Sequence, residues 1–297
     1  MFKCFETPDQ THLLDVMPFK MKHKLLGHPT LTIESLSKIL PEIESNRVMY
    51  SKGLSDLGIN FDRAHFEHKN GLSLQETIER LKDTSSFIAV RGPQVHPAFK
   101  EIFNDLIDDV SALMRIRGTG NRAIEPTLWL FIASPNAMTP FHFDRYSNFI
   151  MQMRGSKELA IFPPLDQRVI SAENYEAYMD RSEQRPPWNP EMDHLAKKFD
   201  FQPGDMVHIP YTGGHYVKNG PEDISISLSI FFQTNETLKL TNAMRINHRL
   251  RKRGMSPTFV GVNPKLDAFK SSVLPVADLI GATMGRLRNT FLAKPQN

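Results

Sequence analysis

The chain has almost no cysteine and no long apolar segment. Cys4 is its single cysteine, which excludes an intramolecular disulfide and a cysteine-based zinc site. This usage suits a reducing compartment, so we expect a cytoplasmic protein. No uninterrupted apolar run approaches the roughly 18 to 20 residues that span a bilayer, and the first ten residues contain no apolar stretch typical of a signal peptide.

The chain also lacks an excess of charge of one sign. Its 36 basic and 33 acidic residues leave a formal net charge of +3 over 297 residues. That surplus is too small to indicate a nucleic-acid partner, and we expect none. The hydrophobic content of 40% is enough for the core of one large domain or two modest ones.

Residues 1–125 mix helical and strand patterns. The run "TIESLSKILPEI" from Thr32 has apolar residues at helical spacing, and "SLQETIERLKD" adds a capping box of Ser73 and Glu76. A longer helix is predicted over residues 96–116, and the short run "SSFIAVRG" before it is typical of a strand. We therefore expect an N-terminal region of mixed structure that packs on a core.

From Pro126 the pattern changes to short β-prone runs. They are separated by Gly, Pro, Asn and Asp, which is the spacing of an antiparallel sandwich or barrel. The runs are "TLWLFIAS", "NFIMQMRG", "KELAIFPP", "DMVHIP", "HYVKN" and "SISLSIFF". We assign residues 126–234 to this core, so the fold is predicted to be mainly β with helical flanks.

The segment from Asp166 to Asp200 lacks the strand pattern and is rich in charge and proline. It is too long for a plain hairpin loop, so we expect it to form part of a substrate mouth. Trp188 in this insert is a candidate for a lid, whereas Trp129 is expected in the core.

Residues 235–297 are predicted to form a helical extension. Two helical runs, 237–254 and 276–293, are joined by a linker containing Pro and Gly. Their apolar residues should pack on the barrel or on a second copy of the chain, which makes a homodimer possible. The basic stretch from Arg245 to Arg253 could contact phosphates or an anionic membrane, but a solvated helix end is favoured.

The stretch "TPFHFD" places His142 and Asp144 two residues apart after an apolar run. Alternate side chains of a strand share a face, so these two would project together. An HxD pair is common and by itself usually binds nothing. A metal site would need a third ligand, and the later histidines are His194, His208, His215 and His248.

We favour His215 as that ligand. His208 lies inside a predicted strand, whereas His215 opens the next strand after two glycines that let the backbone approach a crowded centre. Two histidines and one carboxylate form the facial triad that suits Fe(II) with a chelating keto acid and dioxygen.

A predicted hairpin follows, with its turn at Arg154 and Gly155. Before the turn, Asn148 shares a face with Ile150 and Gln152, and after it Lys157 begins an apolar strand. Lysine is costly to bury unless an anion meets it. The alternative is a surface lysine at the end of a hairpin.

The ordered motifs "TPFHFD", Asn148, "RGSK", "FPP" and "PGDMVHIPYTGGH" resemble the JmjC or cupin-like Fe(II)- and 2-oxoglutarate-dependent oxygenases. They are similar in particular to the asparaginyl hydroxylase that acts on hypoxia-inducible factor. The resemblance covers roughly residues 127–232. It implies a double-stranded β-helix (jelly roll) core with helical flanks.

The resemblance also implies roles for particular residues. His142, Asp144 and His215 would ligate iron, Lys157 and Thr139 would hold the distal carboxylate of 2-oxoglutarate, and Asn148 would lie near its metal-binding end. Two positions depart from the pattern. "YTGGH" replaces a Trp-rich segment, and Ser229 stands where the similar hydroxylase has an asparagine facing the cosubstrate.

The function expected from these features is that of a 2-oxoglutarate-dependent dioxygenase. It would use Fe(II) and dioxygen to hydroxylate a substrate while converting 2-oxoglutarate to succinate, and by resemblance the substrate is a protein or peptide side chain. Two alternatives stay open. One is a non-catalytic cupin-like module that binds metal and a small acid, and the other is a different metal-dependent cupin enzyme such as an isomerase, which would not need Lys157.

Overall fold

The computed structural model describes the chain except for residues 8, 55, 60–63, 182–185, 276–277 and 279–297. It divides into two compact units. The first comprises Met1–Ser171 and Arg185–Asn235, and the second comprises Ala172–Gln184 and Glu236–Asn297. Among the described residues no helix is both long enough and apolar enough to cross a membrane.

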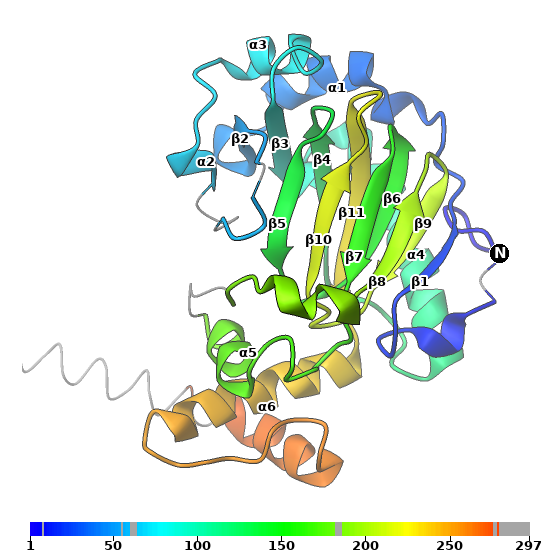
Figure 1. Ribbon diagram of the computed structural model, residues 1–297. Coiled ribbons are helices and arrows are strands. Elements are labelled where there is room, and N and C mark those ends of the chain that lie inside the picture. The colour runs from blue at the N-terminus through cyan, green and yellow to red at the C-terminus, as the bar shows by residue number, and fades with distance from the viewer. Residues whose placement is uncertain (8, 55, 60–63, 182–185, 276–277, 279–297) are drawn as a thin grey trace, which may run out of the picture. The chain divides into compact units, whose positions relative to one another are not determined.

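The first unit is built on two antiparallel sheets (Figure 1). The larger has seven strands in the order β1 (Phe19–Lys22), β9 (Asp205–Ile209), β6 (Ser147–Arg154), β11 (Ser225–Gln233), β4 (Ile124–Ala133), β3 (Ser86–Arg91) and β2 (Val48–Lys52). The smaller has four, in the order β5 (Met138–His142), β10 (His215–Asn219), β7 (Lys157–Ile161) and β8 (Lys197–Phe201). From β4 to β11 the chain passes repeatedly between the sheets. This confirms the prediction of a mainly β, jelly-roll core with helical parts.

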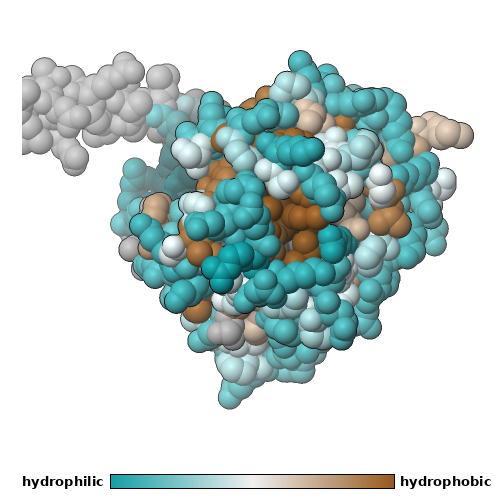
Figure 2. Space-filling view, turned by 90° about the horizontal axis from the view of Figure 1, so that it is seen from above, coloured by the Kyte–Doolittle hydropathy of each residue, from teal (hydrophilic) through white to brown (hydrophobic). Residues whose placement is uncertain are grey.

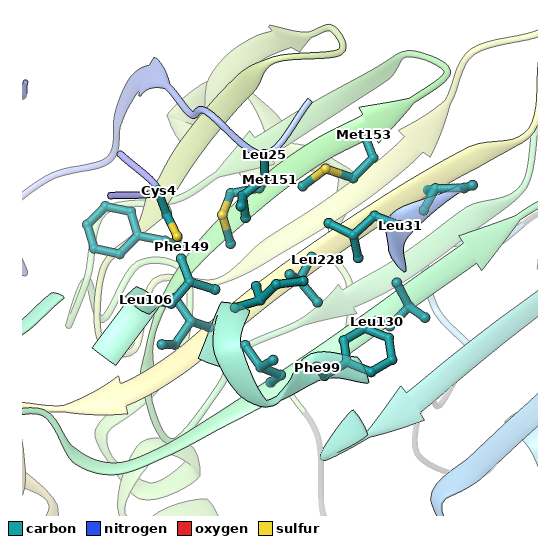
Figure 3. Packing of buried hydrophobic residues seen from close by; sticks show 14 of the residues in the cluster. Cys4, Leu25, Leu31, Phe99, Leu106, Leu130, Phe149, Met151, Met153 and Leu228 are labelled. Carbon is teal, nitrogen blue, oxygen red and sulfur yellow. The ribbon is translucent and has the colours of Figure 1, made fainter. Parts of the chain in front are cut away.

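The larger sheet buries one face against helices. On β4 the alternate residues Leu128, Leu130 and Ile132 are fully buried, as strand periodicity requires. They join one cluster with Leu106 and Val110 of α4 (Lys100–Arg117), which lie four residues apart on one side of that helix. Figure 3 shows Phe99 and Leu106 packed near Leu130 and Leu228.

The N-terminal region contributes strands as well as helices. Its strands β1, β2 and β3 lie in the seven-stranded sheet, so this region extends the sheet of the core. Its helices are α4 and the shorter α1 (Ile33–Ile39), α2 (Ala64–Glu67) and α3 (Leu74–Glu79). The predicted capping box is confirmed at α3, where Ser73 and Glu76 bond to each other's backbone.

A second apolar cluster fills part of the space between the sheets. Its members are Ile150, Leu159, Ile161, Phe199, Phe201, Val207, Ile209 and Val217. The hairpin from β6 to β7 turns at Gly155 with a φ of +68°, a conformation that favours glycine and that agrees with the predicted turn. Seen from above, hydrophobic residues gather in a central hollow ringed by hydrophilic ones (Figure 2).

The insert 166–200 is more structured than its sequence indicates. It contains helix α5 (Ala172–Met179) and a short 3-10 helix, Pro190–Leu195, and β8 already begins at Lys197. The expectation that the whole insert lacks strands is therefore wrong. Phe199 and Phe201 face the apolar cluster while Lys198 and Asp200 are charged and exposed, and this short alternation is the signal that marks β8.

The second unit consists of α5, α6 (Asn235–Arg251) and a helix over residues 264–275. The last of these replaces part of the expected linker. Its neighbour, the predicted run 276–293, lies outside the described residues apart from Asp278.

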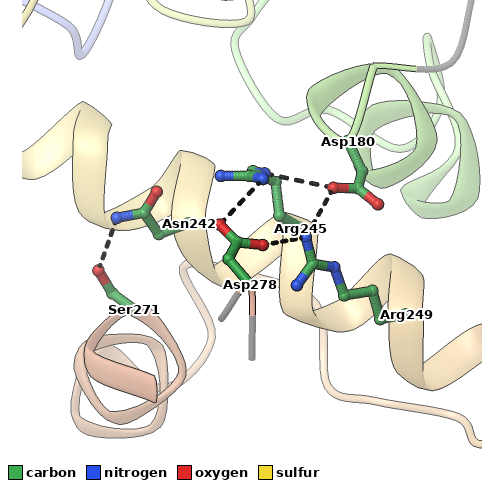
Figure 4. Close-up of polar contacts among 6 residues, drawn as sticks. All are labelled: Asp180, Asn242, Arg245, Arg249, Ser271 and Asp278. Carbon is green, nitrogen blue, oxygen red and sulfur yellow. Dashed lines mark hydrogen bonds and ion pairs between the residues drawn. The ribbon is translucent and has the colours of Figure 1, made fainter. Parts of the chain in front are cut away.

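Ion pairs account for three residues of the basic stretch. Arg245 and Arg249 bind Asp180 and Asp278, as Figure 4 shows, and Arg251 binds the buried Glu176. The expectation of a solvated helix end is therefore wrong for these arginines. Because acids of α5 and of the C-terminal segment neutralise them, they do not form an open phosphate-binding surface.

Candidate metal and cosubstrate site

Three side chains with metal-binding groups meet where β5 and β10 run side by side. His142 ends β5, His215 begins β10, and the two are paired across the strands with ring centroids 4.2 Å apart. Asp144 follows two residues after His142, and its Oδ2 lies 3.6 Å from His215 Nε2. One ligand atom from each of the three lies within 4.8 Å of the others. This group could hold a metal ion.

Backbone carbonyls orient both imidazole rings. His142 Nδ1 lies 2.8 Å from the Pro140 carbonyl oxygen, and His215 Nδ1 lies 3.0 Å from that of Gly213. A carbonyl oxygen can only accept, so in each ring Nδ1 carries a proton, and in the neutral ring Nε2 is the nitrogen with the free lone pair. That tautomer is the one a histidine uses when Nε2 binds a metal.

The glycine turn before His215 permits a crowded approach. A Cβ on Gly214 would lie 2.9 Å from Cε2 of Phe141, closer than real Cβ atoms come. The turn therefore sets the start of β10 directly against β5, which brings His215 beside His142.

His208 occupies a different place. It is fully buried, its Nε2 accepts a hydrogen bond from the Asp15 backbone at 3.0 Å, and its Nδ1 donates to the Asn148 carbonyl oxygen at 3.1 Å. Its ring packs on Phe19 and Phe149, away from the inner residues Val207 and Ile209. Both of its nitrogens are used within the core, so it does not compete with His215.

The three side chains line a cavity of about 430 Å³ including its open mouth. The other lining residues are Phe131, Thr139, Asn148, Ile150, Lys157, Ile209, Val217 and Phe231. Thr139, Asn148 and Lys157 were expected from the sequence. The apolar residues were not, because their contribution depends on which strands become neighbours.

Lys157 is the unusual member of this lining. The residue is only 7% exposed, and burial lowers its pKa to about 7, with no offsetting hydrogen bond or charge among the described residues. An ammonium group in such a place is stable only beside an anion. The surface-lysine alternative is therefore wrong.

Two more buried polar atoms face the space between the sheets. Asn148 Oδ1 and Ser229 Oγ have no hydrogen-bond partner among the described residues. Asn148 on β6 is paired with Phe231 on β11. Ser229 is two residues before Phe231 and therefore shares its face of the strand, so the side chains of Asn148 and Ser229 lie on the same face of the sheet, on neighbouring strands. An unsatisfied buried polar atom costs about 1 to 3 kcal/mol, which favours a polar ligand here.

Trp188 does not face this cavity. Its ring packs against Phe141 and Tyr216, with centroids 5.5 and 5.3 Å away. Each of those residues neighbours a histidine of the site and points to the opposite face of the smaller sheet. Trp188 therefore covers the outer face, and the expectation that it forms a lid is wrong.

Comparison with known proteins gives one family match and several structural neighbours. An Escherichia coli ycfD crystal structure has a TM-score of 0.49 and 15% identity, over 93% of this chain and 69% of that one. The E. coli ribosomal oxygenase YcfD in complex with cobalt and 2-oxoglutarate has a TM-score of 0.47 and 16% identity, over 88% of this chain and 62% of that one. Likeness at this level is too weak to transfer an activity or a residue's role.

The family model for the cupin-like domain matches residues 55–238. This span covers more than half of the chain and includes every residue of the site described above. It agrees with the two-sheet architecture and with the resemblance found in the motifs. The protein belongs to the cupin-like domain family.

Proposed function

We propose that this protein is an Fe(II)- and 2-oxoglutarate-dependent oxygenase that hydroxylates its substrate. The observation that carries the proposal is the pairing, in one cavity, of a two-histidine-one-carboxylate group with a buried lysine that has no anionic partner in the described part of the chain. The first suits Fe(II) with three open positions, and the second suits the far carboxylate of a keto acid.

His142, Asp144 and His215 would hold the metal. Their donor set of two neutral imidazoles and one carboxylate fits Fe(II), and the two Nδ1 hydrogen bonds keep the rings in the required tautomer. When bound, the metal and cosubstrate would supply the oxidising chemistry, in which 2-oxoglutarate, dioxygen and the substrate give succinate, carbon dioxide and the hydroxylated substrate, each organic product receiving one oxygen atom.

Lys157 and Thr139 would bind the distal carboxylate of 2-oxoglutarate. Both line the cavity, and a carboxylate beside Lys157 would restore the protonated form that burial disfavours. Asn148 and Ser229 would satisfy their unpaired polar atoms on the bound cosubstrate or on water beside it.

A protein or peptide side chain is the proposed substrate, supported by the motif resemblance. A cytoplasmic location is supported by the single free cysteine, Cys4. We also propose that the C-terminal helices pair with a second copy, since Phe269 of the helix 264–275 is 63% exposed and Val262, just before that helix, is 70% exposed. Light scattering of the full chain tests the pairing, and a monomer at micromolar concentration would contradict it.

Anaerobic titration tests the proposed activity. Adding Fe(II) and then 2-oxoglutarate should produce the visible charge-transfer band of the chelate, and admitting oxygen should yield succinate. A non-catalytic binding module would bind the acid without forming succinate. Another type of cupin enzyme would bind metal without a requirement for 2-oxoglutarate.

A further inference from the structure

The two faces of strand β4 differ sharply in exposure. Leu128, Leu130 and Ile132 on one face are completely buried by the helical layer. Trp129 and Phe131 on the other face are only partly buried, although β4 lies well inside a seven-stranded sheet. Large aromatic side chains left partly open at such a central position commonly mark a binding surface.

These two rings join a third to form what we call the aromatic face: Trp129, Phe131 and Phe231. Trp129 is stacked near Phe131, with centroids 6.0 Å apart and an interplanar angle of 16°, and it is tilted against Phe231 at 6.1 Å. Phe131 and Phe231 line the cavity that holds the metal-binding group, and Trp129 is paired with Ser229. The aromatic face therefore continues directly from the cavity.

The surface beside the aromatic face is also apolar. The strand neighbour of Phe131 is Ala89, whose own neighbour on β2 is Met49, and both pack in one apolar cluster with Trp129 and Phe131. Among the residues paired with Trp129 and Phe131 on the neighbouring strand β3, only Arg91 is charged. It is the partner of Trp129 and is exposed at the end of its strand. A charged group placed on this surface away from Arg91 would lose water without gaining a partner.

We propose that the aromatic face binds the substrate and selects an apolar group, aliphatic or aromatic, next to the metal ligands. The inference rests on the proposed oxygenase function and adds the chemical class of the substrate. The bound group must enter the cavity that His142 and His215 also line. A single side chain or a small molecule can do so, whereas a broad protein surface cannot.

Tryptophan fluorescence tests this directly, because the chain contains only two tryptophans. The variant Trp188→Phe leaves Trp129 as the reporter and keeps an apolar ring on the outer face. In the zinc-loaded variant with 2-oxoglutarate, N-acetyl-leucine amide should shift the Trp129 emission with a saturating curve in the millimolar range. N-acetyl-aspartate amide and N-acetyl-lysine amide should bind at least about tenfold more weakly. Equal binding of the charged amides, or no shift with the leucine amide, would overturn the proposal.

A second measurement uses the iron-loaded protein. N-acetyl-leucine amide should stimulate succinate formation, Trp129→Ala should reduce that stimulation at least about tenfold, and Trp129→Phe should restore most of it. Stimulation that persists in Trp129→Ala would also overturn the proposal. If wild type forms neither the charge-transfer band nor succinate, the oxygenase function fails instead, and the fluorescence result still decides the apolar selectivity.

Discussion

The hydroxyl of Tyr216, the residue after His215, donates a 2.7 Å hydrogen bond to the carboxylate of Asp193. Lys198 binds the other carboxylate oxygen at 2.7 Å, and burial together with Asp193 raises the pKa of Tyr216 to about 12. The insert is thus clamped to the strand that carries the third proposed ligand. This part of the insert is therefore held against the outer face of the strand that begins with His215.

Removing the clamp should weaken metal binding without abolishing it. Tyr216→Phe keeps the ring contacts but loses the hydrogen bond to a charged group, which is worth about 1.5 to 3 kcal/mol. We expect a lower melting temperature and a rise of up to about tenfold in the Fe(II) dissociation constant. Tyr50→Phe, on β2, is the control and should leave the metal affinity at the wild-type value. An unchanged affinity in Tyr216→Phe would show that the clamp does not position His215.

Loss of a proposed ligand should have a much larger effect. Asp144→Ala and His215→Ala each remove one of three donors, so Fe(II) affinity should fall by more than the roughly 10- to 100-fold typical of outer-sphere changes. Calorimetric titration measures this. His208→Gln is the matched control, because His208 lies in the core, and a folded variant should bind metal normally. Metal binding that depends on His208 and not on His215 would refute the proposed ligand set.

Lys157→Met should separate cosubstrate binding from metal binding. Removing one partner of a buried charge pair costs about 3 to 5 kcal/mol, which corresponds to a rise of roughly 100-fold or more in the dissociation constant for 2-oxoglutarate. Fe(II) affinity should change little. The control is Lys218→Met, since Lys218 is an exposed lysine on the adjacent strand β10. Normal 2-oxoglutarate affinity in Lys157→Met would favour a non-oxygenase cupin.

The affinity for 2-oxoglutarate should fall as the pH rises through about 7. In the free protein burial lowers the pKa of Lys157 to about 7, so above that pH a proton must be taken up before the ammonium can bind a carboxylate. The carboxylates of 2-oxoglutarate stay ionised in this range, so the dissociation constant should rise by up to about tenfold per pH unit.

Calorimetry in buffers of different ionisation enthalpy measures that proton uptake. Zinc-loaded protein should be used, because the bound metal keeps His142 and His215 from titrating. Lys157→Arg, whose guanidinium stays charged, should abolish the slope. Proton release on binding, or a slope that survives in Lys157→Arg, would contradict the assignment.

The stability of the second unit should depend on Glu176. This carboxylate is fully buried and accepts hydrogen bonds from Asn247, at 2.9 Å, and from Arg251. Glu176→Ala removes the buried carboxylate and leaves Arg251 with Glu173 as its remaining acidic partner, so the unit should lose about 1.5 to 3 kcal/mol of stability for each hydrogen bond to Glu176 that is removed. Hydrogen exchange of α6 amides reports this loss. Arg253→Ala, an exposed neighbour in sequence, should leave the exchange unchanged.

Much of the fold followed from local patterns in the sequence. Short β-prone runs separated by turn residues predicted β4, β6, β7, β9, β10 and β11, and the capping box predicted the start of α3. Strand alternation also predicted that His142 and Asp144 project together, although β5 ends at His142 and Asp144 lies just beyond the strand. The two glycines before His215 favoured it as the third ligand, and the structure brings all three together.

Tertiary structure alone decided which distant segments become neighbours. Pairing of β5 with β10 sets His142 opposite His215, and pairing of β4 with β11 joins Trp129 to Phe231. The burial of Lys157 and the partners of Arg245, Arg249 and Arg251 likewise depend on long-range packing. A sequence pattern specifies which face a side chain takes within its own element. What that face meets is set by strand register and by helix packing, and these are contacts between residues far apart in the chain.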